Sequence, residues 1–132
     1  MKSVLVVASS LLLAACAGNQ QLINGGPPVT NVTVNGTYIV INQEPIVTRG
    51  PATVTWNVIA NGYEFPDTPM GIEFKNPGPP YSNPTGVFSC APKGVIISCK
   101  NTGAKGMYRY TIRVKRTSDG KIFEFDPTVM ND

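Results

Sequence analysis

Glycine and proline interrupt this chain so often that a long helix has little room to form. All twelve prolines follow Cys16, and thirteen glycines are spread along the sequence. Between residue 29 and the C-terminus, a single stretch free of both residues exceeds ten positions, residues 107–119. Its apolar and polar side chains alternate with the period of two that is typical of a half-buried β-strand. The sequence therefore predicts an all-β fold without helices.

The first candidate strands surround a hairpin signal. Residues 29–34 and 37–42 flank Asn35-Gly36, a pair that favours a two-residue turn in which both central residues take positive φ. Residues 70–75 form a shorter candidate strand. The segment that follows, residues 76–84, holds four prolines and is predicted to be a loop.

The clearest candidate for a core strand is residues 52–60. Val54, Trp56 and Val58 fall on one face of this strand, and threonine and asparagine fall on the other. Trp56, the single tryptophan of the chain, is predicted to anchor the core.

Two cysteines lie on neighbouring candidate strands, residues 86–90 and 95–100. We expect Cys90 and Cys99 to form a disulfide in an oxidising compartment. The residues between the strands, Ala91-Pro92-Lys93-Gly94, form a turn by composition, but a turn centred there does not place the two cysteines opposite one another. Either the turn is displaced, or the bridge joins residues outside the regular ladder.

Residues 106–127 are predicted to form the best-specified hairpin. Tyrosine, isoleucine and valine at even positions from 108 to 114 alternate with polar residues at odd positions, and Asp119-Gly120 is a second two-residue turn signal. Because directly opposed residues share a face, one face is predicted to carry ion pairs and the other apolar contacts. The predicted pairs are Lys115 with Glu124, Arg113 with Asp126, and Val114 with Phe125.

About eight short strands with turn signals between them indicate a β-sandwich or barrel over residues 29–132. Residues 29–127 resemble immunoglobulin-like sandwiches in two respects: Trp56 lies on an early strand, and Gly106-Met107-Tyr108 opens a late strand like a tyrosine corner. The resemblance implies an antiparallel sandwich of about seven to eight strands, with Tyr108 bonded to nearby backbone. Tyr110 stands where antibody-type domains have their second cysteine, so the resemblance concerns architecture and carries no function.

The N-terminus has the layout of a secretory signal. Lys2 precedes an apolar run over residues 4–13, which is too short to span a bilayer as a helix of roughly 20 apolar residues would. Leu13-Ala14-Ala15-Cys16 resembles the lipobox of bacterial lipoproteins, in which the cysteine is acylated and becomes the first mature residue. The alternative is an ordinary signal peptide, because Ala15-Cys16-Ala17 also fits a small-x-small cleavage site.

The lipobox resemblance implies how the chain is divided and where in the cell the protein lies. Residues 1–15 form the signal peptide, and residues 16–28 form the lipidated Cys16 and a flexible tether. Lipidation also accounts for the third cysteine, which would otherwise be an odd exported thiol. In this family an aspartate after the cysteine usually marks retention in the inner membrane. Ala17 at that position therefore implies the outer membrane, with the domain facing the periplasm or the cell surface.

The charge of the chain argues against nucleic acid as a partner. Eleven basic residues stand against eight acidic ones, and removal of Lys2 with the signal leaves ten against eight, which is far from the strongly basic balance of nucleic-acid-binding proteins. The basic residues are concentrated between Lys93 and Lys121, where Asp119 is the only acidic residue. This uneven distribution makes the late strands a candidate binding surface.

The residue content excludes several kinds of catalysis. There is no histidine, which removes the commonest general base and metal ligand, and lipid and a disulfide account for the cysteines. Glu64, Asp67 and Glu73 are the only clustered carboxylates. They admit glycoside hydrolysis or weak calcium binding, but a solvated loop explains them equally well. We expect no enzyme activity, no cofactor and no metal.

Two groups of side chains are candidates for binding. Arg109, Arg113 and Lys115, with Lys121 nearby, form a basic strand face that suits phosphate-bearing lipid or acidic glycan. Tyr63, Phe65 and Tyr81 are candidates for recognition at one end of the sandwich.

These observations lead to a functional hypothesis. We expect a non-catalytic, lipid-anchored envelope protein whose domain binds an envelope protein or glycan, or serves as an assembly part. The alternatives are a small inhibitor of a hydrolase, or a binder of glycan or lipid phosphate through the basic strand face.

Overall fold

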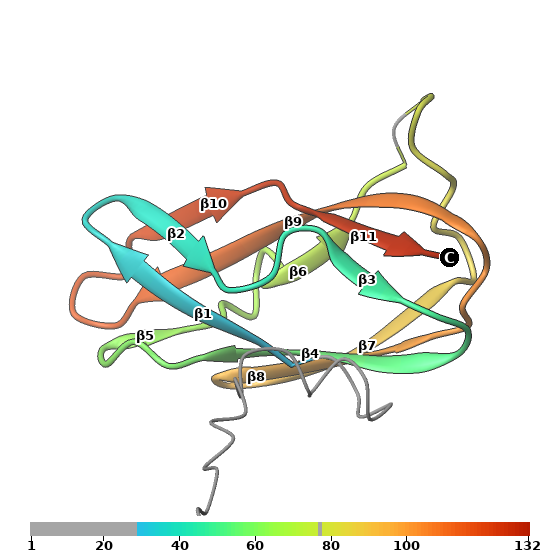
Figure 1. Ribbon diagram of the computed structural model, residues 1–132. Coiled ribbons are helices and arrows are strands. Elements are labelled where there is room, and N and C mark those ends of the chain that lie inside the picture. The colour runs from blue at the N-terminus through green and yellow to red at the C-terminus, as the bar shows by residue number, and fades with distance from the viewer. Residues whose placement is uncertain (1–28, 77) are drawn as a thin grey trace, which may run out of the picture.

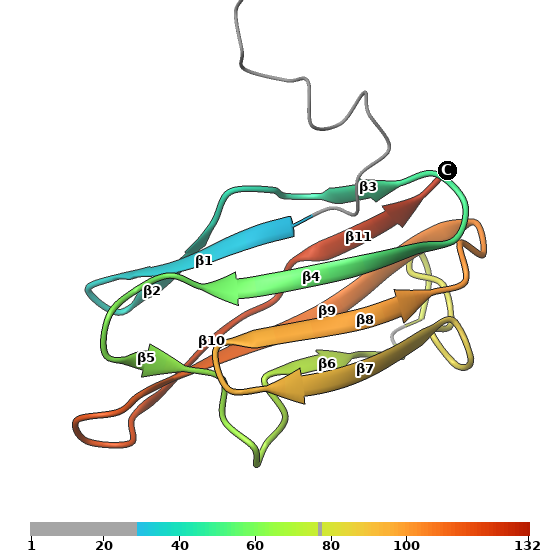
Figure 2. The ribbon, with the colours of Figure 1, turned by 90° about the horizontal axis from the view of Figure 1, so that it is seen from below.

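The computed structural model of the protein describes residues 29–76 and 78–132, and within this part of the chain it contains eleven β-strands and no helix. The prediction of an all-β fold is confirmed. Cys16 and the predicted signal peptide and tether lie outside the described residues. The strands form two sheets that lie face to face as a sandwich (Figures 1 and 2).

The first sheet has the strand order β2-β1-β4-β8-β7. Its β1 and β4 are parallel, and its other pairs are antiparallel. Its strands are β1 (Val29–Asn35), β2 (Tyr38–Ile41), β4 (Ala52–Val58), β7 (Phe88–Lys93) and β8 (Ile96–Asn101).

The second sheet is built around its longest strand, β9 (Gly106–Arg116). One edge of β9 pairs with β10 and β11, and the other edge pairs with β5 and β6. The short β3 completes this sheet by pairing in parallel with β11. The remaining bounds are β3 (Ile46–Thr48), β5 (Tyr63–Glu64), β6 (Ile72–Phe74), β10 (Ile122–Phe125) and β11 (Thr128–Asn131).

The core lies between the sheets and is centred on two aromatic residues. Trp56 of β4 and Tyr110 of β9 are both fully buried, and their rings meet edge to face with centroids 5.2 Å apart. The Trp56 Nε1–H donates a hydrogen bond of 3.0 Å to the Tyr110 hydroxyl, so neither polar group is buried without a partner. The role predicted for Trp56 is confirmed.

Tyr108 makes the backbone contact that its position implied. Its ring is buried, and its hydroxyl donates to the backbone oxygen of Ala104 at 2.8 Å. The bond fixes the loop that enters β9. Residues 76–84 are described, apart from residue 77, and contain no strand, as predicted for this loop.

The first hairpin turns one residue later than predicted. Asn35 pairs with Tyr38, so the two-residue turn is Gly36-Thr37. Gly36 has φ +62°, and no residue other than glycine among those described has positive φ. This matches a type II′ turn, which needs glycine only at its first central position, whereas the expected type I′ turn would have placed Asn35 at positive φ.

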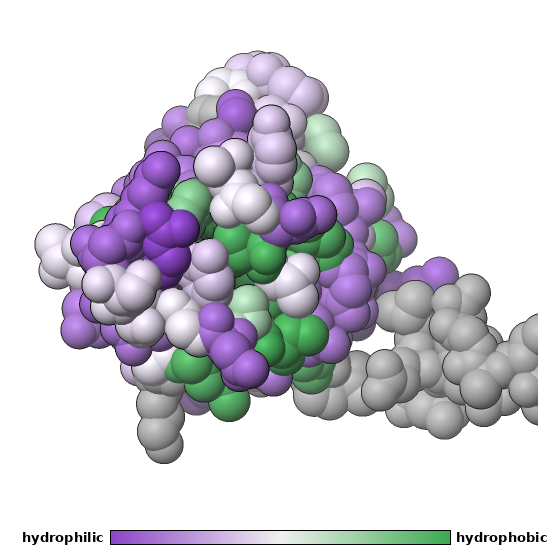
Figure 3. Space-filling view, turned by 90° about the vertical axis from the view of Figure 1, so that its left-hand side faces the viewer, coloured by the Kyte–Doolittle hydropathy of each residue, from purple (hydrophilic) through white to green (hydrophobic). Residues whose placement is uncertain are grey.

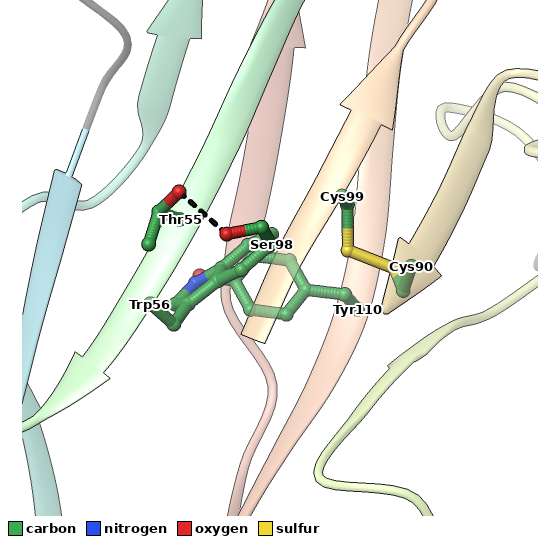
Figure 4. The surroundings of a disulfide bond; sticks show 6 residues. All are labelled: Thr55, Trp56, Cys90, Ser98, Cys99 and Tyr110. Atoms are coloured by element: carbon green, nitrogen blue, oxygen red, sulfur yellow. Dashed lines mark hydrogen bonds between the residues drawn. A yellow bond between two sulfur atoms is a disulfide. The ribbon is translucent and has the colours of Figure 1, made fainter. Parts of the chain in front are cut away.

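The hairpin of β7 and β8 resolves the conflict over the disulfide. Cys90 and Cys99 are bridged and lie directly opposite one another, and Figure 4 shows them on neighbouring strands beside Trp56 and Tyr110. The turn is displaced to Gly94-Val95, and Pro92 lies within β7. Proline is tolerated there because β7 is an edge strand, where a missing N–H costs no ladder hydrogen bond.

The register predicted for β9 and β10 is wrong by two residues. Lys115 lies opposite Ile122, Arg113 opposite Glu124, and Val114 opposite Phe123. The N–H of Arg116 donates to the oxygen of Lys121. Residues 117–120 therefore form a four-residue loop in place of the predicted two-residue turn. Asp119 is held inside this loop by an ion pair with Arg116 at 2.6 Å.

Candidate functional site

The outer face of the second sheet carries the basic residues expected to bind ligands, and all three are paired with carboxylates. Arg109 contacts Asp126 at 3.2 Å, and Lys115 contacts Glu64 at 2.8 Å. Arg113 lies between Glu73 and Glu124, at 2.7 Å and 2.6 Å. The positive charge of this face is therefore largely balanced within the molecule.

The pKa values on this face reflect the pairing. Hydrogen bonds to Glu124 and Glu73 raise the pKa of Arg113, and the hydrogen bond to Glu64 raises the pKa of Lys115. Burial on its own would raise the pKa of Asp126, but a hydrogen bond from Thr111 and the charges of Lys75 and Arg109 outweigh it and lower that pKa. Each group is held in its charged form.

The three candidate aromatic residues do not gather at one end of the sandwich. Tyr63 pairs with Arg116, at the C-terminal end of β9, and its ring lies 6.2 Å from that of Phe123. Phe65 is buried in the core. Tyr81 is next to Ser82, whose N–H bonds to Met107 at the opposite end of β9, and its ring lies beneath Arg109. About nine strand residues, or roughly 30 Å, separate the two ends.

The carboxylates considered for catalysis are dispersed. Glu64 and Glu73 are bonded to different cations on the outer face of the second sheet, and Asp67 is exposed in the loop between β5 and β6. The described residues hold no cluster of three or more cysteine, aspartate and glutamate side chains close enough to bind a metal ion. No helix capable of crossing a bilayer occurs in the described part of the chain.

The outer face of the first sheet differs sharply from that of the second. Its outward side chains are mostly threonine, asparagine, serine and valine, and the only charged one among those the structure describes is Lys100. Lys93 ends β7 at a corner of this sheet, and its side chain is not among those described. We call this surface the uncharged face. Its outward positions are Val29, Asn31, Thr33, Asn35, Tyr38, Val40, Thr53, Thr55, Asn57, Ser89, Ala91, Ile96, Ser98 and Lys100.

Exposed apolar side chains cross one end of the uncharged face. Val40 of β2 lies opposite Thr33 of β1, and the N–H of Ile59 bonds to the oxygen of Val32, the residue before Thr33. Ile96 of β8 lies opposite Asn57. We call the resulting set the apolar row. Its members and exposed fractions are Tyr38 76%, Val40 47%, Ile59 52%, Val95 44% and Ile96 42%.

Figure 3 views the molecule from the end at which the β1–β2, β7–β8 and β9–β10 hairpins turn, and hydrophobic side chains reach the surface there. Lys100 lies four residues beyond Ile96 on β8, about 13 Å away. Lys93, the last residue of β7, lies opposite Ile96, so a basic residue flanks the apolar row at the β7 edge of the sheet.

Hydrogen bonds within the uncharged face leave part of it free to bind. Thr55 and Ser98 bond to one another at 3.0 Å, as Figure 4 shows. Asn31 and Asn57 lie side by side on β1 and β4, and neither side-chain amide bonds to another described residue. The face thus presents amide donors and acceptors beside exposed apolar surface.

The uncharged face was not predicted from the sequence, because the predicted binding residues were the charged and aromatic ones. The available signal was the lack of charge at alternate positions of residues 29–35 and 52–58. No family of known proteins matches the sequence, and no curated protein matches it either. Function must therefore be inferred from the surface itself.

Proposed function

We propose that this chain is a non-catalytic, lipid-anchored envelope protein whose sandwich binds a protein partner through the uncharged face. The observation that carries the proposal is the contrast between the two outer faces. Protein interfaces are depleted in charge and enriched in tyrosine at their centres, whereas an ordinary soluble surface mixes charges of both signs. The second sheet has the ordinary composition and the first does not.

The apolar row supplies part of the free energy that association requires. Complete burial of a valine or isoleucine side chain contributes about 1.5–3 kcal/mol, and the members of the row are roughly half exposed. Covering them would contribute about 1 kcal/mol each. The total of about 5 kcal/mol only matches the low end of the cost of association, which is about 4–15 kcal/mol, so the hydroxyls and amides of the rest of the face must also find partners.

The absence of catalysis is part of the proposal. Support comes from Glu64 and Glu73, whose carboxylates are bonded to Lys115 and Arg113. The same ion pairs favour the uncharged face over the basic strand face as the binding surface, because a phosphate or acidic glycan would have to displace them.

The location in the outer membrane and the immunoglobulin-like type of sandwich are also proposals. Leu13-Ala14-Ala15-Cys16 supports lipidation at Cys16 and placement in the outer membrane. The buried Trp56 and the bond from Tyr108 to Ala104 favour an immunoglobulin-like sandwich. Intact-mass analysis of the native protein tests the anchor: an unmodified chain beginning at Gly18 would contradict it.

Photo-crosslinking in the intact envelope tests the binding surface. A photoreactive residue placed at Val40 samples the uncharged face. The same residue at Val47 of β3 is a matched control, because Val47 is also an exposed valine on a short edge strand, but belongs to the second sheet. We expect a discrete protein adduct from position 40 and little or none from position 47. Equal adducts from both positions, or none from position 40, would refute the proposal.

A further inference from the structure

We propose that the partner on the uncharged face is a second copy of this chain. The two copies are related by a two-fold axis that lies between the two apposed faces. This inference rests on the proposed function and names the occupant of the same surface. It predicts a closed dimer in which the two first sheets stack.

Charge decides which surfaces of two copies can meet. Burying a charge without a partner costs several kcal/mol, so an uncharged face is best covered by another uncharged face. The outer face of the second sheet carries five ion-pair contacts, which join Lys75, Arg109, Arg113 and Lys115 to four carboxylates. Stacking the first sheet of one copy on the second sheet of another would bury those charges. A symmetric contact between two first sheets buries none of these four carboxylates, and Lys100, the charged side chain described on that face, lies at the far end of β8 from the apolar row. Such a contact also closes the assembly instead of extending it into a filament.

The amides beside the apolar row are self-complementary. Asn31 and Asn57 are neighbours on β1 and β4, and each amide offers donors and an acceptor. Across a two-fold axis these amides meet their own counterparts, so each donor has an acceptor of the same kind opposite it. The bonded pair of Thr55 and Ser98 beside them is already satisfied and can be buried at little further cost.

The flat area of the face supplies a little over half of the surface that each partner of a standard interface buries. Five strands spaced about 4.8 Å apart, each with about six residues rising 3.3 Å, give a plane of roughly 24 by 20 Å. That is about 480 Å² before side-chain relief and the protruding apolar row are counted. A standard interface buries about 800 Å² on each partner. Side-chain relief adds to this flat area, as do Ile59 and Val95, the two exposed members of the apolar row that lie outside the strands of the face.

The position of the predicted anchor agrees with this geometry. The described chain begins at Val29, which is itself an exposed residue of the uncharged face. Residues 17–28, if they form the tether that their composition predicts, would span roughly 20 Å. Both tethers of a two-fold dimer would start beside the shared interface, so both copies can be anchored in one membrane. Anchoring in a common membrane raises the effective concentration of each copy for the other.

Co-isolation of two differently tagged full-length copies tests the dimer. Both copies are expressed together, one is captured in mild detergent, and the amount of the other is measured. We expect the wild-type chain to bring down its tagged counterpart. Val40→Glu places a charge in the stacked face of each copy, so it should reduce recovery at least tenfold. Val47→Glu makes the same change on the second sheet and should leave recovery unchanged.

Every outcome bears on the inference. Failure of the wild-type pair to co-isolate overturns it, and so does equal recovery for the two variants, since co-residence in micelles would produce that result. If Val40→Glu unfolds, as the emission of Trp56 would show, Ile96→Glu on β8 of the same sheet replaces it and should give the same tenfold loss. If the copies do not co-isolate while position 40 still crosslinks to a different envelope protein, the dimer is wrong and the proposed function stands.

Discussion

The hydrogen bond between Trp56 and Tyr110 can be removed by a single atom change, Tyr110→Phe. The substitution keeps the ring and its edge-to-face contact with Trp56 at 5.2 Å, and it deletes only the hydroxyl that accepts the indole N–H at 3.0 Å. Both side chains are fully buried, so water cannot replace the lost acceptor. The variant therefore leaves an indole N–H without a partner in the core.

The expected cost follows from that orphaned donor. A buried polar group left unsatisfied costs about 1–3 kcal/mol. For a domain of about one hundred residues, 2 kcal/mol corresponds to a fall of roughly 8–16 °C in Tm. In guanidinium chloride, with a denaturant slope of about 4 kcal/mol per molar, the same loss moves the midpoint by roughly 0.5 M.

Fluorescence-monitored denaturation measures the effect, because Trp56 is the only tryptophan of the chain and is fully buried in the folded state. Tyr81→Phe is the matched control. It removes a hydroxyl that bonds to no other described residue, so it should change the free energy of unfolding by less than about 0.5 kcal/mol. If Tyr110→Phe is equally silent, the hydrogen bond does not stabilise the core as argued.

Three further substitutions test other parts of the fold. Gly103→Ala should destabilise the domain by more than Gly120→Ala. Both glycines have positive φ, near +79° and +72°, but a Cβ at 103 would overlap the backbone of the β3–β4 turn, whereas a Cβ at 120 meets nothing within 4 Å. Equal free energies of unfolding for the two variants would contradict the close approach at Gly103. Replacing Cys90 and Cys99 together with alanine should lower the free energy of unfolding by about 2–3 kcal/mol in the chain-entropy model, measured by denaturation without reductant. Asp126→Asn should make the free energy of unfolding fall less steeply as pH decreases. The folded-state pKa of this carboxyl is lowered, so its contribution to stability is present above its ordinary pKa of about 3.9 and is lost as pH falls towards the folded value. Denaturation series from pH 5 to pH 2 measure the slope, and an unchanged slope would count against the Asp126 ion pairs.

The alternation of apolar residues predicted which faces are buried, but not which residues are paired. In the β9–β10 hairpin the predicted partner of Lys115 was Glu124, and the observed partner is Ile122. A shift of two residues keeps every side chain on the same face, because the period of a strand is two. Hydrophobic pattern alone cannot distinguish such registers. The same parity rule holds at the first hairpin, where moving the turn by one residue changes each partner by two.

Local chemistry selected the observed registers. The disulfide required Cys90 and Cys99 to be opposite one another, and this constraint moved the turn to Gly94-Val95 and left Pro92 inside a strand. In the later hairpin, the ion pair between Arg116 and Asp119 stabilises a longer loop. Composition had indicated a turn at Pro92 and a tight turn at Asp119, and in each case a contact between side chains outweighed it.

The candidate site could not be predicted from the local sequence pattern of single strands. Glu64 and Glu73 neutralise the cations of β9 from strands more than thirty residues earlier in the chain, and the uncharged face combines five strands in an order that departs from the sequence. Until the strand order is known, the neutral side chains of β1, β4 and β8 are only scattered residues. Their common surface is a property of topology.

The central place of β9 has a consequence for how the polypeptide acquires its shape. Strands made before it, β5 and β6, and strands made after it, β10 and β11, all depend on it for backbone partners. A nascent chain that stops short of residue 106 therefore holds three short strands without their partners, because β3 pairs with β11 and both β5 and β6 pair with β9. Assembly of the second sheet is therefore postponed until most of the chain has been made, and pairings between such distant segments form slowly.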